Sequence, residues 1–197
     1  GERAAEPGSA GVTYKIGVAV SVTGAASTLG EPERDVALML QEQINAQGGL
    51  TDDAGIDHPI EIIVQDTQGS SDVALQVVKK LVDDDQVVAI VVPSTSYETM
   101  ALIPVTQEAR VSLVSLASSH DIVQPINTRF WTFKVAQSNE HTSPWQVRYA
   151  QTKGYSKIAS LYVNNAYGED GADAIRKSAS AAGIEIVLEE TFGADDK

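Results

Sequence analysis

The chain has 197 residues, of which 43% are hydrophobic and 21% are charged, an ordinary composition for a globular protein with a real core. Fourteen basic residues against twenty-seven acidic ones give a formal net charge of −13, which disfavours binding to nucleic acid or to an anionic membrane surface. The chain contains no cysteine, which excludes disulfides, thiol nucleophiles and cysteine-based zinc sites within it.

Residues 1–13 are rich in Gly, Ala, Ser, Glu and Pro and show no periodicity. This pattern predicts a flexible terminal segment. It also fits the spacer that remains when a signal peptide is removed, with a lipoprotein tether as a further alternative. No apolar run approaches the ~20 residues that a membrane-spanning helix needs.

Short apolar runs then alternate with helical periods. Residues 14–22 are predicted to form a strand, and a polar loop at 21–30 leads into a helix whose first turn is marked by Pro32. Because the order is β-α-β-α-β-α-β with right-handed crossovers, the sequence predicts a doubly wound parallel sheet of the α/β class. Further strands of this sheet are expected at 60–65, 87–92, 111–116 and 129–135.

The alternation starts again after residue 134, but only two more strands follow, at 158–163 and 184–190. Helices are expected at 144–153 and 170–182. Two strands make a poor independent sheet, so this second α/β lobe is expected to be incomplete, and its open edge predicts self-association. The expected divisions are a flexible segment at 1–13, lobe one at 14–134, a hinge crossover at 135–139 and a partial lobe two at 140–197.

Three polar loops follow strands of the predicted sheet, at 21–30, 93–96 and 115–119. In open α/β sheets ligands bind outside the carboxyl ends of the strands, so we expect these loops to surround one site. Several hydroxyl groups together with helix N-terminal amides favour an anionic group such as a carboxylate. A single Ser or Thr in such a loop is about as often only a helix cap, so the prediction depends on the three loops together.

The sequence offers little support for catalysis. Glu31 stands where a phosphate-binding loop requires lysine, and neither a dinucleotide fingerprint nor a Gly-x-Ser-x-Gly elbow occurs. His58, His120 and His141 lack metal-ligand spacing, and His58 is expected on the surface. We therefore predict no catalytic residue, no metal and no cofactor. A flavodoxin-like or nucleoside-processing α/β enzyme stays an alternative, because fold alone does not exclude it.

Several motifs resemble the opening of the periplasmic branched-chain amino acid-binding proteins, which are type I solute-binding proteins of ABC transporters. The resemblance runs from about Tyr14 to the last residue. Its motifs are Thr23-Gly24 through Gly30, Ile44-Asn45-Ala46-Gln47-Gly48-Gly49-Leu50, Ile63-Val64-Gln65-Asp66-Thr67, Leu113-Val114-Ser115 with Ser118-Ser119, and Asn164-Asn165-Ala166-Tyr167-Gly168.

The resemblance implies a two-lobed clamshell that binds an amino acid or another small carboxylate without turnover. In the family, the ligand carboxylate is held at positions matching Ser96 and Ser119, and backbone groups around Ser94 and Ala117 help. The match to the family's second hydroxyl position can shift by one residue, so that position corresponds to either Ser118 or Ser119. The lobe-one site residues that the resemblance implies are Ser94, Thr95, Ser96, Ala117, Ser118 and Ser119.

Two further positions complete the implied site. Leu29 stands where the family often has an aromatic residue that caps the ligand, and Tyr167 matches a lobe-two tyrosine that closes over it. In the family, the acidic residue that pairs with a ligand ammonium usually lies beyond the position of Lys197. The resemblance therefore does not distinguish an amino acid ligand from a simple aromatic or aliphatic acid. The implied partner is an ABC membrane permease, and the implied location is the periplasm or the cell exterior. A ligand-sensing domain of a receptor or regulator with the same fold is an alternative.

Overall fold

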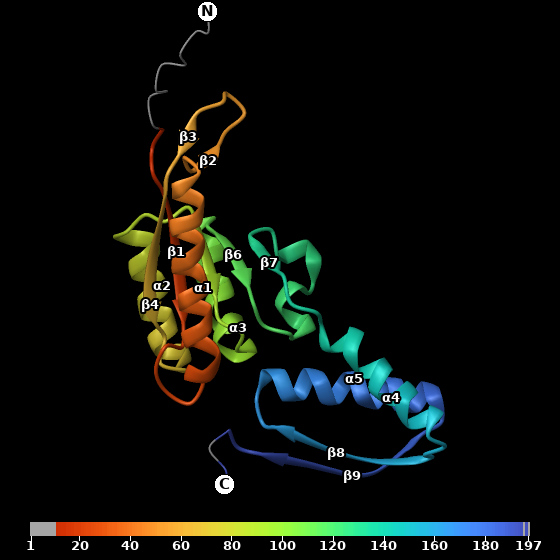
Figure 1. Ribbon diagram of the computed structural model, residues 1–197. Coiled ribbons are helices and arrows are strands. Elements are labelled where there is room, and N and C mark those ends of the chain that lie inside the picture. Colours follow the sequence, from red (N-terminus) through yellow and green to blue (C-terminus); the bar gives the residue numbers. More distant parts are fainter. Residues whose placement is uncertain (1–10, 195, 197) are drawn as a thin grey trace, which may run out of the picture.

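The computed structural model describes residues 11–194 and residue 196, which form two α/β units (Figure 1). The first unit, residues 11–134, contains a five-stranded sheet of order β4-β1-β5-β6-β7 in which every neighbouring pair is parallel. The predicted doubly wound parallel sheet is thus confirmed. The strands are β1 (Tyr14–Val20), β2 (Leu50–Thr51), β3 (Asp57–His58), β4 (Ile60–Asp66), β5 (Ala89–Val92), β6 (Ser112–Ser115), β7 (Thr132–Lys134), β8 (Lys157–Val163) and β9 (Glu185–Phe192).

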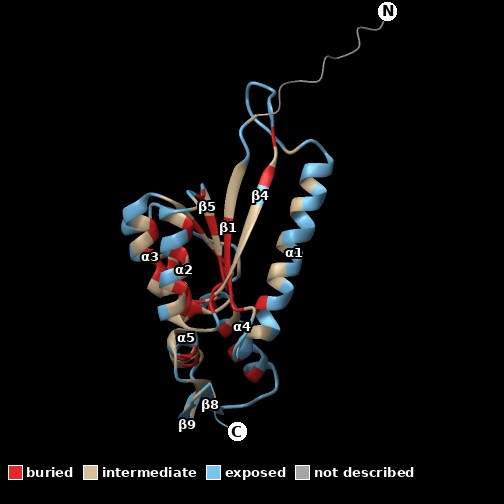
Figure 2. Ribbon diagram, turned by 90° about the vertical axis from the view of Figure 1, so that its left-hand side faces the viewer, coloured by how far each residue is buried: buried red, intermediate tan, exposed pale blue. Residues whose placement is uncertain are grey.

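The direction of winding reverses between β1 and β5. From β1 the chain moves outward to β4 and then returns to the other side of β1. Helix α1 (Ser27–Ala46) lies on one face of the sheet, and α2 (Ser71–Asp83) and α3 (Ser96–Ala109) lie on the other (Figure 2). Such a switch point leaves a crevice outside the carboxyl ends of the strands. The loops after β1 and β5 therefore flank the place where open α/β sheets bind ligands.

The hydrophobic core of the first unit lies between the sheet and helices α2 and α3. Ile90 and Leu113 from the strands are fully buried against Val78, Leu81 and Leu102 from these helices. Val78 and Leu81 are three residues apart, on one face of α2, as an amphipathic helix requires. Burial of a side chain of this size stabilises a fold by ~1.5–3 kcal/mol. This packing holds in place the strands that carry the polar loops.

Helix α1 covers its face of the sheet less completely. Val36 and Leu40 of α1 are substantially exposed. A groove of about 500 Å³ lies between these residues and Val18 and Val91 of the sheet. The described residues leave this apolar groove unfilled.

Helix α1 begins earlier than the sequence predicted. It starts at Ser27, so Leu29 and Gly30 lie in its first turn rather than in a loop, and Pro32 lies inside the helix. Gly30 permits the early start, because its lack of a Cβ atom lets the helix approach the backbone of Ser21. The polar loop after β1 is therefore shorter than expected.

The two helices of the second unit, residues 139–194, also begin early. Helix α4 (Asn139–Thr152) starts five residues before the predicted position, and the Ser138 amide before it donates to Nδ1 of His141 at 3.2 Å. Helix α5 (Ala166–Ala182) starts four residues early, because the Asn165 side chain accepts hydrogen bonds from the first turn. None of the described helices is long and apolar enough to cross a membrane.

The predicted strand at 129–135 is shorter in the structure. Only β7 pairs with β6, and the loop before it contains two short 3-10 helices, η1 (His120–Val123) and η2 (Ile126–Thr128). The Trp131 amide donates to the Gln107 side chain at 2.6 Å. The Trp131 carbonyl oxygen accepts a hydrogen bond from the Leu113 amide of β6 at 2.8 Å, just before β7 begins.

His58 lies in the β2–β3 hairpin, and the prediction that it is a surface residue is wrong. Only 7% of its surface is exposed. The ring stacks on Tyr14 with ring centroids 4.5 Å apart. Its Nδ1 lies 2.9 Å from the Val12 carbonyl oxygen and its Nε2 lies 3.2 Å from the Asp52 carboxylate. His58 therefore joins the residues before β1 to the hairpin.

We expect His58 to make the stability of the chain depend on pH. Hydrogen bonds to the Val12 carbonyl and then to the Asp52 carboxylate raise the pKa of His58. Its stabilising contribution should be fully present below the unfolded pKa of about 6.5 and should disappear as pH rises through the raised folded pKa. The pKa of Asp52 is lowered, chiefly by the Ile56 amide and then by His58, so its own contribution is lost as pH falls through that lowered value.

Urea unfolding of the chain and of His58→Gln, at about pH 5.5 and about pH 8.5, measures this contribution. The unfolding midpoint of the unsubstituted chain should fall further between the two pH values than that of the variant. Other titrating groups are common to both proteins and cancel in the comparison. The same pH dependence in both would show that His58 does not contribute.

The second unit has a small sheet, in which β8 and β9 pair in parallel. Helix α5 lies on one face, where Arg176 contacts Tyr162. Since side chains alternate along a strand, Leu161 points away from α5, and Leu161 and Leu188 are 70% and 53% exposed. The same face also carries Lys157, Glu185 and Glu190, and the described residues leave it uncovered. Self-association through it stays a prediction.

Candidate ligand-binding site

Three polar loops meet at the carboxyl ends of β1, β5 and β6, which are adjacent strands. They contain residues 21–26, 93–95 and 116–119. Hydrogen bonds of their side chains and backbone amides connect them, and two buried or half-buried carboxylates lie beneath them. The site is thus built from the ends of parallel strands and the first turns of α1 and α3.

Glu98, in the first turn of α3, is fully buried (0% exposed) beneath these loops. Its Oε2 accepts hydrogen bonds from the Ser21 hydroxyl at 2.9 Å and from the Thr95 hydroxyl. The Ser21 hydroxyl oxygen lies 3.0 Å from that of Thr67, which follows β4. One carboxylate therefore connects the ends of three strands. Its other oxygen, Oε1, has no hydrogen-bond partner among the described residues.

Glu33 of α1 binds the loop after β5 from the opposite face of the sheet. Its Oε1 accepts hydrogen bonds from the Ser94 amide at 3.1 Å and from the Ser94 hydroxyl. Burial raises the pKa of Glu33; the bonds from Ser94 oppose this rise, and the negative charge of Glu98 adds to it. A carboxylate of the chain itself therefore occupies both hydrogen-bond donors of Ser94.

Sequence reasoning missed Glu33 and Glu98 as site residues. An acidic residue near the start of a helix is usually explained by its favourable interaction with the helix dipole. The only signal in the sequence was the position of both residues just after hydroxyl-rich loops. Their carboxylates are buried because α1 and α3 pack against the sheet, which no local sequence pattern indicates.

Ser96 and Ser119 lie together but are buried, with 0% and 1% of their surface exposed. The Ser96 hydroxyl oxygen accepts a hydrogen bond from the Ser119 amide at 3.2 Å, which joins the start of α3 to the loop after β6. The Ser119 hydroxyl oxygen accepts from the Asp121 amide at 3.3 Å, and the Ala117 amide donates to the Ser115 hydroxyl at 3.1 Å. These groups hold the loops to one another in this conformation.

Ala117 is fully buried as well, and the other five predicted site residues keep accessible surface. Leu29 and Tyr167 are 49% and 48% exposed, in the first turns of α1 and α5. A ligand could contact them without movement of the loops, whereas Ser96 and Ser119 require such movement. The three half-buried residues of this set are Ser94, Thr95 and Ser118.

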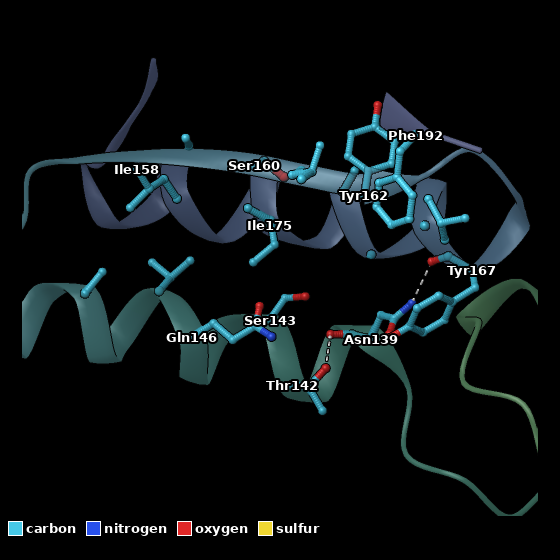
Figure 3. Close-up of a pocket in the computed structure, with 18 residues that line it drawn as sticks. Asn139, Thr142, Ser143, Gln146, Ile158, Ser160, Tyr162, Tyr167, Ile175 and Phe192 are labelled. Carbon is cyan, nitrogen blue, oxygen red and sulfur yellow. Dashed lines mark hydrogen bonds between the residues drawn. The ribbon is translucent and has the colours of Figure 1, made fainter. Parts of the chain in front are cut away.

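A hollow of about 490 Å³ lies elsewhere, in the second unit, between α4 and the β8–β9 sheet (Figure 3). Ile158, Ile175 and Phe192 form apolar parts of its wall. Of the predicted site residues only Tyr167 lines it, where the Asn139 side-chain amide donates to the Tyr167 carbonyl at 3.2 Å. None of the hydroxyl loops contributes to it, so we place the candidate site at the loops.

Within residues 11–194 and 196, no group of three His, Asp or Glu side chains is placed to hold a metal ion. Two of the histidines lie in separate contacts with carboxylates. His58 lies beside Asp52, and Nε2 of His120 lies 3.4 Å from the Glu140 carboxylate. The arrangement of the loops is suited to hydrogen bonding with a small polar ligand.

The sequence matches the family described as periplasmic binding protein over residues 13–196. It is 27% identical over 188 residues to the leucine-, isoleucine-, valine-, threonine- and alanine-binding protein of Pseudomonas aeruginosa, an alignment that covers 94% of this chain and 48% of that protein. The chain therefore spans about half the length of the curated relatives it matches.

Solved structures of similar proteins share the fold. The branched-chain amino acid transporter substrate-binding protein of Streptococcus pneumoniae, in complex with isoleucine, is 28% identical with a TM-score of 0.80, covering 93% of this chain and 51% of that one. A solute-binding protein of an ABC transporter from Rhodopseudomonas palustris BisB5, in complex with 3,4-dihydroxybenzoic acid, is 24% identical with a TM-score of 0.79, covering 92% and 47%. At that identity the second likeness shows the fold alone.

Proposed function

Because the chain belongs to the periplasmic binding protein family, we propose that it serves to capture a small solute outside the cytoplasmic membrane for the permease of an ABC importer. The function is binding without turnover. Contacts of the ligand with both lobes would favour a closed form over an open one, which is how a ligand shifts a conformational equilibrium.

The observation that carries this proposal is the set of hydroxyl loops at the switch point of the sheet. The three loops follow adjacent parallel strands, and two of them, after β5 and β6, carry Ser94, Thr95 and Ser118, which keep accessible surface. Because both donors of Ser94 bind Glu33 and the Thr95 hydroxyl binds Glu98, charge-assisted hydrogen bonds to a ligand, worth ~1.5–3 kcal/mol each, come from Ser118 and from loop groups that the ligand releases from these partners. A few of them are sufficient for a useful affinity when the ligand is small.

We propose an amino acid as the ligand. The P. aeruginosa relative is named for binding leucine, isoleucine, valine, threonine and alanine, and the S. pneumoniae structure contains isoleucine. The chain's own site adds an electrostatic argument. Glu33 holds a negative charge against Ser94, and Glu98 lies beneath Thr95.

A ligand with a carboxylate alone is disfavoured near Ser94. Two like charges about 5 Å apart repel by roughly 3 kcal/mol at an effective dielectric constant of about 20, and an opposite charge is attracted by the same amount. An ammonium group on the Ser94 side offsets the charge of Glu33, and the carboxylate then lies toward Ser118. The site therefore favours an amino acid over a simple aromatic or aliphatic acid.

The division of the chain into lobe one at 14–134, a hinge at 135–139 and a partial lobe two at 140–197 is part of the proposal. In it, Leu29 covers the ligand from lobe one and Tyr167 covers it from lobe two. Both side chains are half exposed in this structure, as is expected of groups that a ligand would cover. We also propose an extracytoplasmic location, with residues 1–13 as the spacer of a lipid tether; residues 1–10 lie outside the described residues.

A thermal-shift screen tests the function, with leucine and 4-methylpentanoate as a matched pair that differs only in the ammonium group. A ligand at about 100 times its dissociation constant stabilises the folded state by ~2.7 kcal/mol. We expect a shift with leucine or another amino acid and at least about tenfold weaker binding of its deaminated partner. Equal shifts would refute the ammonium assignment, and no shift with any amino acid would refute the proposed function for this chain.

A further inference from the structure

Asp170 connects the second unit to the candidate ligand loop of the first. It lies in α5, and its Oδ1 accepts a hydrogen bond from the His120 amide at 3.2 Å. Its Oδ2 accepts from the side-chain amide of Asn139 at 2.7 Å. The carboxylate of this α5 residue thus binds both the loop after β6 and the first residue of α4.

Asn139 holds the same loop at a second point. Its backbone amide donates to the Ser118 carbonyl oxygen at 3.2 Å, and its side chain binds Asp170. The side chain also donates to the Tyr167 carbonyl (Figure 3). The loop is therefore held by the second unit at Ser118 and at His120. Ser119 lies between these points, and its amide donates to Ser96 in the first unit.

The surroundings of Asp170 are partly dehydrated. Burial raises the pKa of Asp170, against the lowering effect of the bonds from His120 and Asn139. Burial also lowers the pKa of Lys134, at the end of β7, and the charge of Asp170 opposes this. Hydrogen bonds to a carboxylate are worth more in such surroundings than on an open surface.

We propose that Asp170 is a positioning residue, which sets the geometry of the Ser118–His120 segment according to the orientation of the second unit. The proposal rests on the proposed function only where it treats this segment as part of a ligand site. Movement of α5 relative to the five-stranded sheet must either carry the segment along or break the bond from Asp170 to His120. Asp170 thus couples lobe movement to loop geometry at His120, beside the bond from the Asn139 amide to the Ser118 carbonyl.

Hydrogen exchange of single amides in Asp170→Ala distinguishes positioning from a general effect on stability. The His120 amide loses its acceptor directly and is therefore uninformative. The Ser119 amide keeps its acceptor, because Ser96 belongs to the first unit. Faster exchange at Ser119 requires that the segment itself has become free to move.

We expect the Ser119 amide to exchange about tenfold faster in Asp170→Ala, the loss that one charge-assisted hydrogen bond represents. Amides of the α2 core, such as those of Val78 and Leu81, should keep their rates. Asp173→Ala is the matched control, since Asp173 lies one turn further along α5 and pairs with Arg176 on the exposed surface. Unchanged exchange at Ser119, or equal acceleration throughout the chain, would overturn the proposal.

A second arm uses leucine as the probe. If the unsubstituted chain binds it, Asp170→Ala should weaken binding about tenfold while Asp173→Ala leaves it unchanged. Unchanged affinity in Asp170→Ala would overturn the link between the segment and the ligand. If the unsubstituted chain binds no amino acid, the proposed function fails, and the exchange experiment still decides whether Asp170 positions the loop.

Discussion

The substitution Gly30→Ala should lower the free energy of unfolding by about 3 kcal/mol, near the upper end of what overpacking usually costs. A Cβ atom at Gly30 would lie 2.1 Å from the carbonyl oxygen of Ser21 and 2.8 Å from its amide nitrogen. Both are backbone atoms, so no rotation of a side chain relieves the contact. Helix α1 must move away from the end of β1, and Glu33 must move with it.

Gly171→Ala is the matched control. Gly171 lies inside α5, and its added Cβ atom would lie 3.5 Å from the Asn139 side chain, which is an ordinary contact. In a helix interior, alanine is more favourable than glycine by up to about 1 kcal/mol. Urea unfolding followed by circular dichroism should therefore give effects of opposite sign for the same substitution in two helices. A loss below about 1 kcal/mol in Gly30→Ala would mean that α1 can shift with little cost.

The second unit repeats this arrangement at Gly168. A Cβ atom there would lie 1.8 Å from the carbonyl oxygen of Val163, at the end of β8. In both units the helix turns back over the end of the preceding strand, and only glycine fits at the closest approach. Both glycines belong to the motifs that carry the family resemblance, and close backbone contact is the physical reason for glycine in them.

The strands of the two parallel sheets and the three polar loops could be predicted because their signals are local; the short β2–β3 hairpin was not predicted. Apolar runs such as the one at 87–92 and the polar residues after them are visible in a short window of sequence. Parallel order then follows from the alternation of strands and helices. Ser94, Ser96 and Ser119 could accordingly be placed at one edge of one sheet before any coordinates were known.

The early starts of α1, α4 and α5 and the burial of the carboxylates could not be predicted in the same way. The early start of α5 depends on the side chain of Asn165, which the sequence allows to be either a cap or a loop residue. Glu33, Glu98 and His58 carry no local sign of burial, because their partners are distant in sequence. Their positions depend on how α1, α3 and the hairpin pack against the sheet.

Ser96→Ala should destabilise the unliganded chain by about 1–3 kcal/mol. The substitution removes the hydroxyl oxygen that accepts the Ser119 amide, and it leaves a buried N–H group without a partner, which costs this amount in proteins. Ser178→Ala is a suitable control, since its hydroxyl donates to the Ala174 carbonyl within α5 and no buried donor depends on it. Urea unfolding of both variants measures the difference.

The same variant separates two roles for Ser96. If Ser96 acts as a connection between α3 and the loop after β6, stability falls without any ligand, and the loop with Ser119 becomes mobile. If Ser96 acts only by contacting a ligand, stability is unchanged in the free chain and only the affinity for an amino acid falls, by about tenfold to a hundredfold. The bond to Ser119 and the complete burial of both residues favour the first result. Under that result ligand binding depends on Ser96 through the loop that it holds, which is also the loop that Asp170 holds from the other unit.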